Sequence, residues 1–500
     1  MVEKNRFSRL LKQLMSVAEV KNYTLSQQLQ YDVSYISKWT SGQLLPSEKY
    51  EKKILRGISS CVVSECVETA RDKLLADYQV ENAEELKMAI FDHLEAEYYY
   101  TKNSQENDGG NTELKINYFP EVTLSQYIAK MRHPVLRRVN SLEIISALDI
   151  FAMNHEYRLQ ITQLENSRVE KGRGYPDVHY SMLVDIQKEY WDYIYDTIFL
   201  VYLLGKNSCV DFELYGGTPA DGRAIFVVKE EYSISGMLLG RDHCISVVTS
   251  ENPEICNTLY HNLTALCNRE MLLFRKTTMR DMLANNEYIH GMLSLRQSWI
   301  IGHLTEHFLP EDVFEEIVEM LEKTTGEAKT GTVRPEQLRS VYRMTSRIIE
   351  ESDIRILIYK TTFYNLIVER KIDFYNCKIQ LNARQQKRCL EYFMDLVCNH
   401  PNVQVYMIEG RIITDLEYND RHCLFLSEMV SYLRLDEAQN NLLLINRVDM
   451  REKFSKTFEV IWKSEEKGIV KNKEVIAANI QHVMQGIFAE KEALTDGTCV

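Results

Sequence analysis

The segment "HLTEH", His303–His307, places three side chains that can do acid–base or metal chemistry within a very short stretch. Two histidines four residues apart share one face of a helix, which is a spacing that zinc sites use. Glu306 lies beside them, but the sequence supplies no evident third ligand. We therefore expect a surface or packed histidine pair on a helix, and we assign no metal ligands.

A second stretch, "ELYGGTPADGR", contains the adjacent glycines Gly216 and Gly217. Backbone N–H groups of glycines can approach a phosphate closely, but a loop between two strands has the same composition. We favour the loop. The chain has no Gly-x-x-x-x-Gly-Lys, Gly-x-Gly-x-x-Gly, Gly-x-Ser-x-Gly or His-Glu-x-x-His motif. We assign no catalytic residue and no cofactor, and we predict that the protein is not an enzyme.

The chain has 500 residues, which is too many for one hydrophobic core, so two to four domains are expected. Only 9 prolines and 20 glycines interrupt it, which favours a mainly helical chain with some sheet. No run approaches the ~18 apolar residues of a membrane span, so we expect no membrane partner.

The 11 cysteines are scattered and form no Cys-x-x-Cys motif. An odd number without framework spacing is typical of reduced thiols in the cytosol. The first twelve residues are rich in charge, unlike a signal peptide. We therefore expect a cytoplasmic protein.

Charge is distributed unevenly along the chain. Residues 1–60 contain ten lysines and arginines and five acidic residues, a net charge of +5, whereas the whole chain carries -13. The remainder therefore carries -18. A basic segment joined to an acidic remainder is typical of a nucleic-acid-binding module attached to a part that avoids nucleic acid.

The basic segment shows helical patterns. Apolar residues recur with helical spacing over Phe7–Val20. Asp32 can cap a later helix that turns Ile36 and Trp39 inward, and Gly42 suits its end. Two short helices joined by a tight polar turn are the arrangement of a helix-turn-helix unit, whose second helix enters the DNA major groove.

The stretch "LSQQLQYDVSYISKWTSGQLLPS", Leu25–Ser47, resembles the helix-turn-helix of the lambda-repressor/Cro (XRE) family of transcription regulators. Gln30 stands where the family prefers glycine, so we expect a positive φ there. The resemblance implies binding to double-stranded operator DNA. The positions that match the family pattern are Leu25, Leu29, Ser34, Ile36, Ser37, Trp39, Gly42 and Pro46.

The resemblance also suggests which side chains contact DNA. The candidates for reading base edges are Val33, Ser34, Ser37 and Lys38. The candidates for contacting the DNA backbone are Gln27, Gln28, Tyr35, Thr40, Ser41 and Gln43. The alternative is a helical cap that uses the same fold for protein contacts.

We predict a multidomain fold, mainly α with α/β lobes, in which an N-terminal all-α helix-turn-helix domain precedes a helical segment and two α/β lobes. The two lobes appear in the sequence as an internal repeat of element order. The expected parts are a helix-turn-helix domain at 1–60, a helical extension at 61–100, a linker at 101–113, a helical segment at 114–205, a first lobe plus helices at 206–354, and a second lobe with a C-terminal helix at 355–500.

The helical segment is expected to end in a long helix over 179–205 that is rich in aromatic residues. Such a helix can line a ligand pocket, but core or dimer packing is the more common use of aromatic side chains, and we favour it. The aromatic residues are Tyr180, Tyr190, Trp191, Tyr193 and Tyr195.

The segment "INRVDMREKFSKTFEVIWKS" resembles the end of a phospholipase D-like lobe. Active members of that family carry a His-x-Lys motif in each lobe. None of the 12 histidines here is followed two residues later by lysine. The resemblance therefore implies a lobe that has lost the chemistry and serves as a sensor.

Together these patterns predict a transcription regulator whose acidic remainder forms a homodimer and senses a small-molecule or protein effector. One alternative is an enzyme or defence effector that is tethered or autoregulated by its DNA-binding segment. Another is a scaffold that uses this segment for protein contacts.

Overall fold

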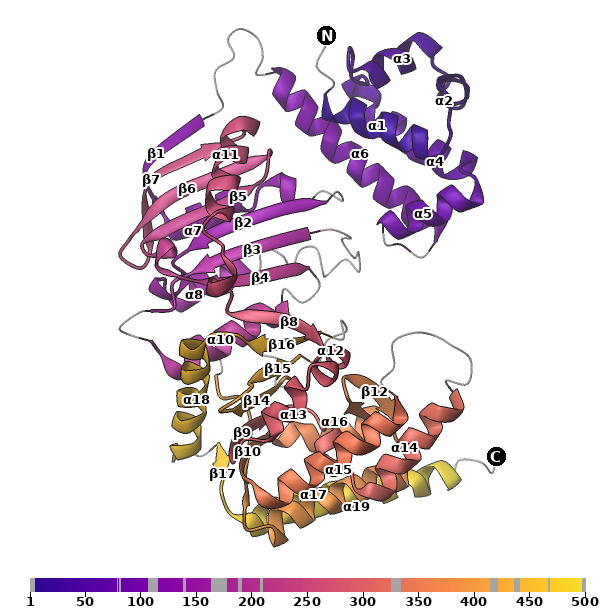
Figure 1. Ribbon diagram of the computed structural model, residues 1–500. Helices are drawn as coiled ribbons and strands as arrows, with labels where there is room; N and C mark the ends of the chain where they lie inside the picture. Colours follow the sequence, from indigo (N-terminus) through magenta and orange to yellow (C-terminus); the bar gives the residue numbers. More distant parts are fainter. Residues whose placement is uncertain are drawn as a thin grey trace. The chain divides into compact units, whose positions relative to one another are not determined.

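The structure is a computed structural model, which describes residues 5–78, 80, 82–106, 116–137, 141–162, 178–187, 191–206, 210–324, 334–413, 421–435, 441–465 and 468–496. Contacts along the backbone divide the chain into two units (Figure 1), and each is described by itself. The first unit comprises Met1–Lys188, Cys209–Glu213 and Gly217–Cys267. The second comprises Glu189–Ser208, Leu214–Gly216 and Asn268–Val500.

The first unit begins with an all-helical domain. Its elements are α1 (Arg6–Val17), α2 (Asn22–Leu29), α3 (Val33–Ser41), a 3-10 turn (Glu48–Tyr50), α4 (Glu51–Glu65), α5 (Glu68–Tyr78) and α6 (Ala83–Glu106). Leu11 of α1, Ile58 of α4 and Ile90 of α6 are fully buried in one core. The expected division between 1–60 and a separate extension at 61–100 is therefore wrong, because the long α6 helix completes the core of the earlier helices.

The expected linker also begins too early. Helix α6 continues to Glu106, and residues 107–113 of the predicted linker lie outside the described residues. Thr101 holds the end of the helix against α1, since its hydroxyl accepts a hydrogen bond from the Phe7 backbone N–H and donates to the Glu97 carbonyl. The predicted linker contains no apolar residue, so its composition does not indicate these tertiary contacts.

The rest of the first unit is built on a mixed sheet with the strand order β1-β7-β6-β5-β2-β3-β4. Strands β2 and β3 are parallel, and the other described pairs are antiparallel. The strands are β1 (Ile116–Thr123), β2 (Leu142–Leu148), β3 (Val178–Val184), β4 (Asp211–Gly216), β5 (Arg223–Val228), β6 (Tyr232–Leu239) and β7 (His243–Ser250). The helices of this part are α7 (Leu124–Met131), α8 (His155–Thr162) and α11 (Pro253–Thr264).

The prediction of a helical segment at 114–205 is wrong, because this segment supplies strands β1, β2 and β3 to the sheet. Strand β2 is buried at six of its seven positions, so its sequence shows no alternation between polar and apolar residues. A strand covered on both faces gives a continuous apolar run, which cannot be told from a buried helix by period alone.

The second unit is built on a sheet with the order β17-β13-β10-β9-β14-β15-β16-β8, in which β9, β10 and β13 are parallel. The strands are β8 (Phe274–Thr278), β9 (Arg296–Ile301), β10 (Asp353–Tyr359), β13 (Val403–Ile408), β14 (Cys423–Ser427), β15 (Tyr432–Arg434), β16 (Asn441–Ile445) and β17 (Ile469–Val470). A separate hairpin joins β11 (Lys371–Phe374) to β12 (Cys377–Gln380).

Helices surround this sheet (Figure 1), and α15 and α17 are among those that contribute buried residues to its hydrophobic core. They are α10 (Tyr193–Lys206), α12 (Met279–Ala284), α13 (Glu287–Met292), α14 (Glu311–Thr324), α15 (Pro335–Glu351), α16 (Lys360–Glu369), α17 (Ala383–Asn399), α18 (Val448–Lys463) and α19 (Lys473–Asp496). The predicted boundary between lobes at 354/355 is wrong, because β8 and β9 pair with strands β16, β10 and β14 from beyond it. The predicted internal repeat of element order is present, although its copies begin earlier than expected. The second sheet, read from β8, has the order β8-β16-β15-β14-β9-β10-β13, which matches β1-β7-β6-β5-β2-β3-β4 strand for strand, and β17 is added at its edge.

Candidate functional site

The turn between α2 and α3 has the predicted geometry. Gln30 ends α2 in the left-handed conformation with φ 57°, which reverses the chain without a glycine. The Asp32 carboxylate accepts a hydrogen bond from the Ser34 backbone N–H at 2.8 Å and caps α3. Gly42 ends α3 with φ 84°. The predictions for these positions are confirmed, and three residues separate the two helices.

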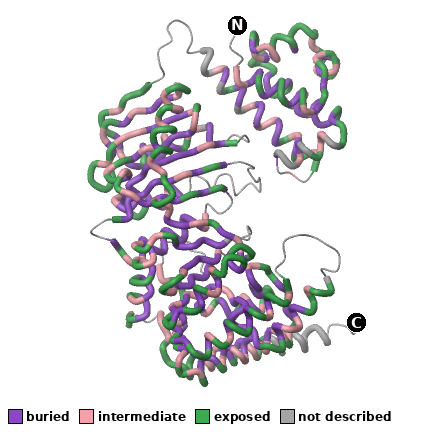
Figure 2. Tube along the Cα trace, in the orientation of Figure 1, coloured by how far each residue is buried: buried purple, intermediate pink, exposed green. Residues whose placement is uncertain are grey.

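Helix α3 divides sharply into a buried and an exposed side. Ile36 is 0% exposed and Trp39 is 1% exposed, so this side anchors the helix to the domain core. Exposed residues predominate over the rest of the helix (Figure 2), and they include Tyr35 and the four predicted base-reading residues, Val33, Ser34, Ser37 and Lys38. The structure therefore brings them together on one accessible surface, and their contact with bases stays a prediction.

The predicted backbone-contacting residues fall into two groups. Thr40 and Ser41 are half-buried, and their hydroxyls donate to carbonyl oxygens of α3 itself, which occupies the hydrogen that a phosphate contact needs. The Tyr35 ring has the Lys38 ammonium 5.9 Å from its centroid. The exposed members of the set are Gln27, Gln28, Tyr35 and Gln43.

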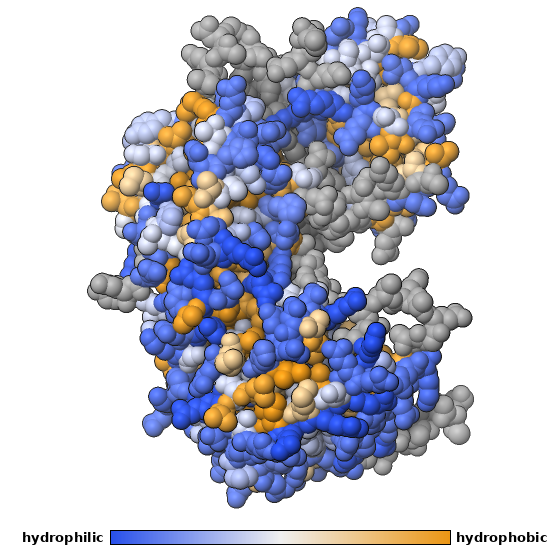
Figure 3. Space-filling view, in the orientation of Figure 1, coloured by the Kyte–Doolittle hydropathy of each residue, from blue (hydrophilic) through white to orange (hydrophobic). Residues whose placement is uncertain are grey.

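The surface of the helical domain is mixed in polarity, with exposed apolar side chains among hydrophilic ones (Figure 3). The net charge of +5 in residues 1–60 is offset by 61–106, which contains four basic and eleven acidic residues. One acidic side chain of α6, Glu95, lies 3.8 Å from the ammonium of Lys52 on α4. Positive charge therefore acts locally around α1 to α4 and not over the whole domain.

The second unit contains a cluster of charged side chains in its interior, which we call the ionic cluster. Arg434 of β15 is 0% exposed and donates to both carboxylate oxygens of Glu306, each at 2.8 Å. The Tyr288 hydroxyl and the Tyr375 backbone N–H donate to the same carboxylate. Burial alone would raise the pKa of Glu306, but the Arg434 guanidinium outweighs it and holds that pKa well below its usual range.

His307 is the neutral member of this region. Burial lowers the pKa of its ring to about 4. Because the Tyr288 hydroxyl donates to Glu306, it accepts from His307 Nε2–H at 3.0 Å. The Thr305 hydroxyl lies 2.9 Å from Nδ1 and donates to it. Both ring nitrogens are thus engaged by protein groups, and no lone pair of His307 remains for a metal.

His303 is the charged histidine. Its Nε2 lies 3.0 Å from Asp373 Oδ2, and its Nδ1 bonds the carbonyl oxygen of Arg421. Both partners only accept, so both ring nitrogens carry hydrogen and the ring is an imidazolium. Burial opposes this charge, but the neighbouring Cys423 and Asp373 raise the pKa of His303 to about 10.

Cys423 begins β14 and lies against the same ring. Its Sγ is 3.6 Å from His303 Nδ1, and its thiol donates to the His303 carbonyl oxygen at 3.4 Å. Burial alone would raise the pKa of the thiol, but the His303 imidazolium and the backbone N–H groups of His303 and Gly302 lower it below the usual value. The His303 ring therefore lies between the Cys423 sulfur and the Asp373 carboxylate.

The "HLTEH" segment is therefore not a helix. His303 follows β9 in a bend, and Glu306 and His307 lie in the short 3-10 helix η6 (Glu306–Phe308). The two histidines are packed, as expected, but they serve different hydrogen-bond networks. No spacing pattern in the sequence points to their main partners, which lie far along the chain at Asp373, Cys423 and Arg434.

The other chemically suggestive stretches have structural roles. The Gly216 carbonyl accepts from Arg447, and a Cβ on Gly216 would lie 2.5 Å from a Leu273 methyl carbon. The Gly217 N–H donates to the Val184 carbonyl at 2.9 Å. The loop prediction for these glycines is confirmed.

The prediction of one aromatic helix over 179–205 is also wrong. Its residues are divided between strand β3, which contains Tyr180, and helix α10, which contains Tyr193 and Tyr195. Trp191 precedes α10, and Tyr190 lies outside the described residues. No helix in the described part of the chain is long and apolar enough to cross a membrane.

No family model and no curated protein matches the chain. Among solved structures, the archaeal chromatin protein TrmBL2, described with a novel mode of DNA binding, is similar at 12% identity with a TM-score of 0.21, covering 52% of this chain and 97% of that one. A phosphatidylserine synthase from Haemophilus influenzae Rd KW20 is similar at 9% identity with a TM-score of 0.22, covering 78% and 97%. Scores this low do not establish a shared fold.

Proposed function

We propose that the chain is a sequence-specific transcription regulator that binds duplex DNA through α3. The observation that carries this proposal is the division of α3 into a buried side and an exposed side of small and basic residues, placed after a three-residue turn from α2. A helix presented in this way fits the width of the major groove. The first residues of the helix, Val33 and Ser34, would then face base edges, and Lys38 would reach bases or phosphates further along.

We propose in addition that the protein acts as a homodimer, because one small helix-turn-helix unit makes few contacts and regulators of this kind bind two half-sites about 34 Å apart. The remainder of the chain would supply dimerisation and the response to a small-molecule or protein effector. No catalytic activity forms part of this proposal.

The test is DNA binding by the purified full-length protein and its variants. Duplexes retained from a randomised library would first define the preferred site, and electrophoretic mobility shifts at two salt concentrations would then measure affinity. We expect Lys38→Ala and Ser34→Ala to weaken binding to that site by about 5-fold to 100-fold each, since a base contact contributes ~1–3 kcal/mol. Lys38→Ala should also reduce the dependence of affinity on salt if its ammonium neutralises a phosphate.

The matched control is Lys87→Ala, which removes a lysine on α6 that pairs with Glu84 of the same helix. This variant should bind within twofold of the parent protein. Equal affinity of the parent and all three variants would exclude α3 as the DNA-binding helix. Footprints with a single half-site, together with a monomer in sedimentation, would contradict the dimer.

A further inference from the structure

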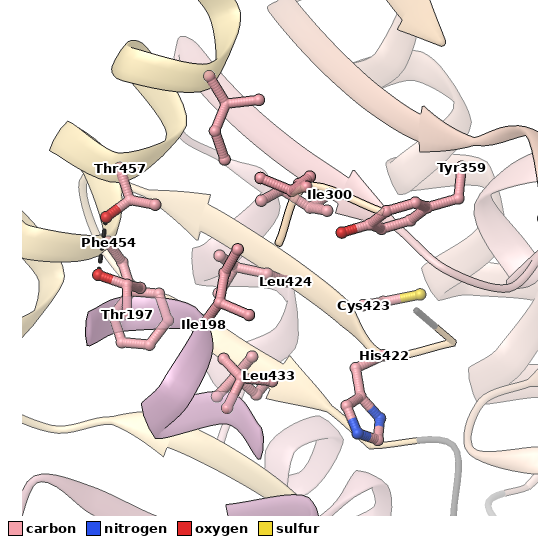
Figure 4. A pocket seen from close by; sticks show the side chains of 13 residues that line it. Thr197, Ile198, Ile300, Tyr359, His422, Cys423, Leu424, Leu433, Phe454 and Thr457 are labelled. Carbon is pink, nitrogen blue, oxygen red and sulfur yellow. Dashed lines mark hydrogen bonds between the residues drawn. The ribbon is translucent and has the colours of Figure 1, made fainter. Parts of the chain in front are cut away.

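Two small hollows of the second unit differ in their linings. One, of about 30 Å³, is walled mainly by apolar side chains, with the hydrogen-bonded pair Thr197 and Thr457 at one end (Figure 4). The other, of about 20 Å³, lies where helix α16 meets the β11–β12 hairpin, and charged and polar side chains predominate in it. We call it the basic hollow. Its charged lining residues are His303, Glu369, Lys371, Asp373, Lys378 and Arg421.

Regular elements of the fold deliver the side chains of the basic hollow. In the hairpin, Asp373 lies directly opposite Lys378, and Lys371 precedes Asp373 by two residues, so these three side chains share one face. In α16, Asn365 and Glu369 are four residues apart and therefore lie on one side of the helix. The hollow is thus formed by two faces whose geometry the hairpin and the helix fix.

The carboxylates of the basic hollow have cationic partners. Asp373 accepts a hydrogen bond from His303 Nε2–H at 3.0 Å and lies 3.6 Å from the buried Arg434 guanidinium. Glu369 Oε1 lies 2.6 Å from Nη1 of Arg421. The negative charge of the lining is therefore already compensated by the protein.

The lining has an excess of positive charge. Four of its side chains are cationic and two are anionic, which leaves two positive charges in excess. Within the described part of the chain, the Lys371 ammonium pairs with no carboxylate and the Asn365 side-chain amide has no hydrogen-bond partner. Both groups can donate hydrogen bonds to an anion that enters the hollow.

Charge and size together select the ligand. A phosphate group carries about −1.5 to −2 at pH 7, which matches the excess better than a carboxylate or a phosphodiester, each of which carries a single charge. The hollow has room for about one group the size of a water molecule. One phosphate oxygen would therefore enter it, and the other oxygens would meet the lysines at its rim.

We propose that the basic hollow binds a phosphate group, either as inorganic phosphate or as the end of a small phosphomonoester. The ammonium groups of Lys371 and Lys378 hold the phosphate by charge, and the Asn365 amide donates to one of its oxygens. An ester keeps its organic part in solvent, because both lysines are exposed. The site belongs to the second unit, whereas α3 belongs to the first, so phosphate binding there does not depend on DNA binding.

Hydrogen–deuterium exchange of the full-length protein tests the site and locates it. The protein is titrated with inorganic phosphate at constant ionic strength, with sodium chloride as the reference. We expect saturable protection of peptides from α16 and the β11–β12 hairpin, and no change in peptides from α14. Titration with methyl phosphate distinguishes the two sources, because equal protection means that the end of an ester is accepted, and protection by inorganic phosphate alone means that the ligand is the free ion. Dimethyl phosphate, with one charge, should bind at least tenfold more weakly, and equal protection by it would overturn the match of charge.

Two variants test the residues. Lys371→Gln and Lys378→Gln should each weaken the binding of inorganic phosphate by about threefold to tenfold. Both lysines are exposed, so exchange without phosphate should equal that of the parent protein. The matched control is Lys323→Gln, which removes an exposed lysine of α14 that pairs with Glu319, and it should bind phosphate as the parent does. No saturable protection in the parent, or equal affinity in the parent and both hollow variants, would show that the proposal is wrong.

Discussion

The exposed side of α3 and the ionic cluster use polar residues in opposite ways. On α3 the polar side chains point to solvent, and the free energy of folding comes from Ile36 and Trp39 beneath them. In the ionic cluster, Arg434 and Glu306 are themselves in the interior, where each charge depends on its partner. Substitutions on the exposed side of α3 should therefore have little effect on folding. The second region cannot lose one charge without leaving another unpaired.

The largest difference should appear when one partner of the buried ion pair is removed. Arg434→Met leaves the Glu306 carboxylate in the interior without its guanidinium, and we expect the second unit to lose ~3–5 kcal/mol of unfolding free energy. Hydrogen–deuterium exchange of peptides from β9 and β14 would measure this loss, because it reports one unit at a time.

Two variants make this prediction specific. Arg347→Met removes an exposed arginine that pairs with Glu351 on α15, and it should leave exchange unchanged. Adding Glu306→Gln to Arg434→Met removes the orphaned charge and should restore part of the loss. Exchange equal to that of the parent protein in the Arg434→Met single variant would show that the ion pair is unimportant for folding.

A smaller effect should appear at alkaline pH. In the folded protein the pKa of His303 is raised to about 10. The stabilisation that the charged ring gives the folded state is therefore complete below the unfolded pKa of about 6.5, and it is lost as pH rises toward about 10. The lowered pKa of Cys423 acts in the opposite direction up to the unfolded thiol pKa of about 8.5. Below about pH 8.5 the thiol therefore offsets part of the loss of stability that His303 causes.

We therefore expect the contribution of this pair to the unfolding free energy of the second unit to fall most steeply between about pH 8.5 and 10, by up to ~1.4 kcal/mol per pH unit. The comparison is between the parent protein and His303→Asn, by exchange of the same peptides across a pH series corrected for intrinsic exchange. A fall of the full ~1.4 kcal/mol per pH unit already above about pH 6.5 would mean that Cys423 gives no offset and that its pKa is not lowered.

The smallest effect concerns the start of α3. Asp32→Ala removes the carboxylate that caps the Ser34 N–H, and we expect amides in the first turn of α3 to exchange a few times faster. Asp32→Asn keeps a capping oxygen and should leave exchange close to that of the parent. Equal exchange in the alanine variant would show that core packing alone fixes the start of the helix.

The contrast between the two regions also explains what the sequence could predict. Around Asp32, Ile36 and Gly42 the determinants are local, since caps, period and turn residues lie within one short stretch. In the ionic cluster, Glu306 meets Arg434 128 residues away, so no spacing rule connects them. The strands of 114–205 were missed for a related reason, because their burial on both faces is decided by the sheet that forms around them.

The edge of the second sheet has a consequence for the order of folding. Strand β8 pairs with β16, so Phe274 faces Ile445, 171 residues further along the chain. Closing such a long loop costs entropy before its contacts form, and proteins dominated by distant pairings fold slowly. Helices α1 to α6 make their contacts within the first 106 residues and can form while the ribosome is still at work. Until β16 is made, the backbone of β8 has no partner from that strand, and an unpaired strand edge is a place where another chain can pair.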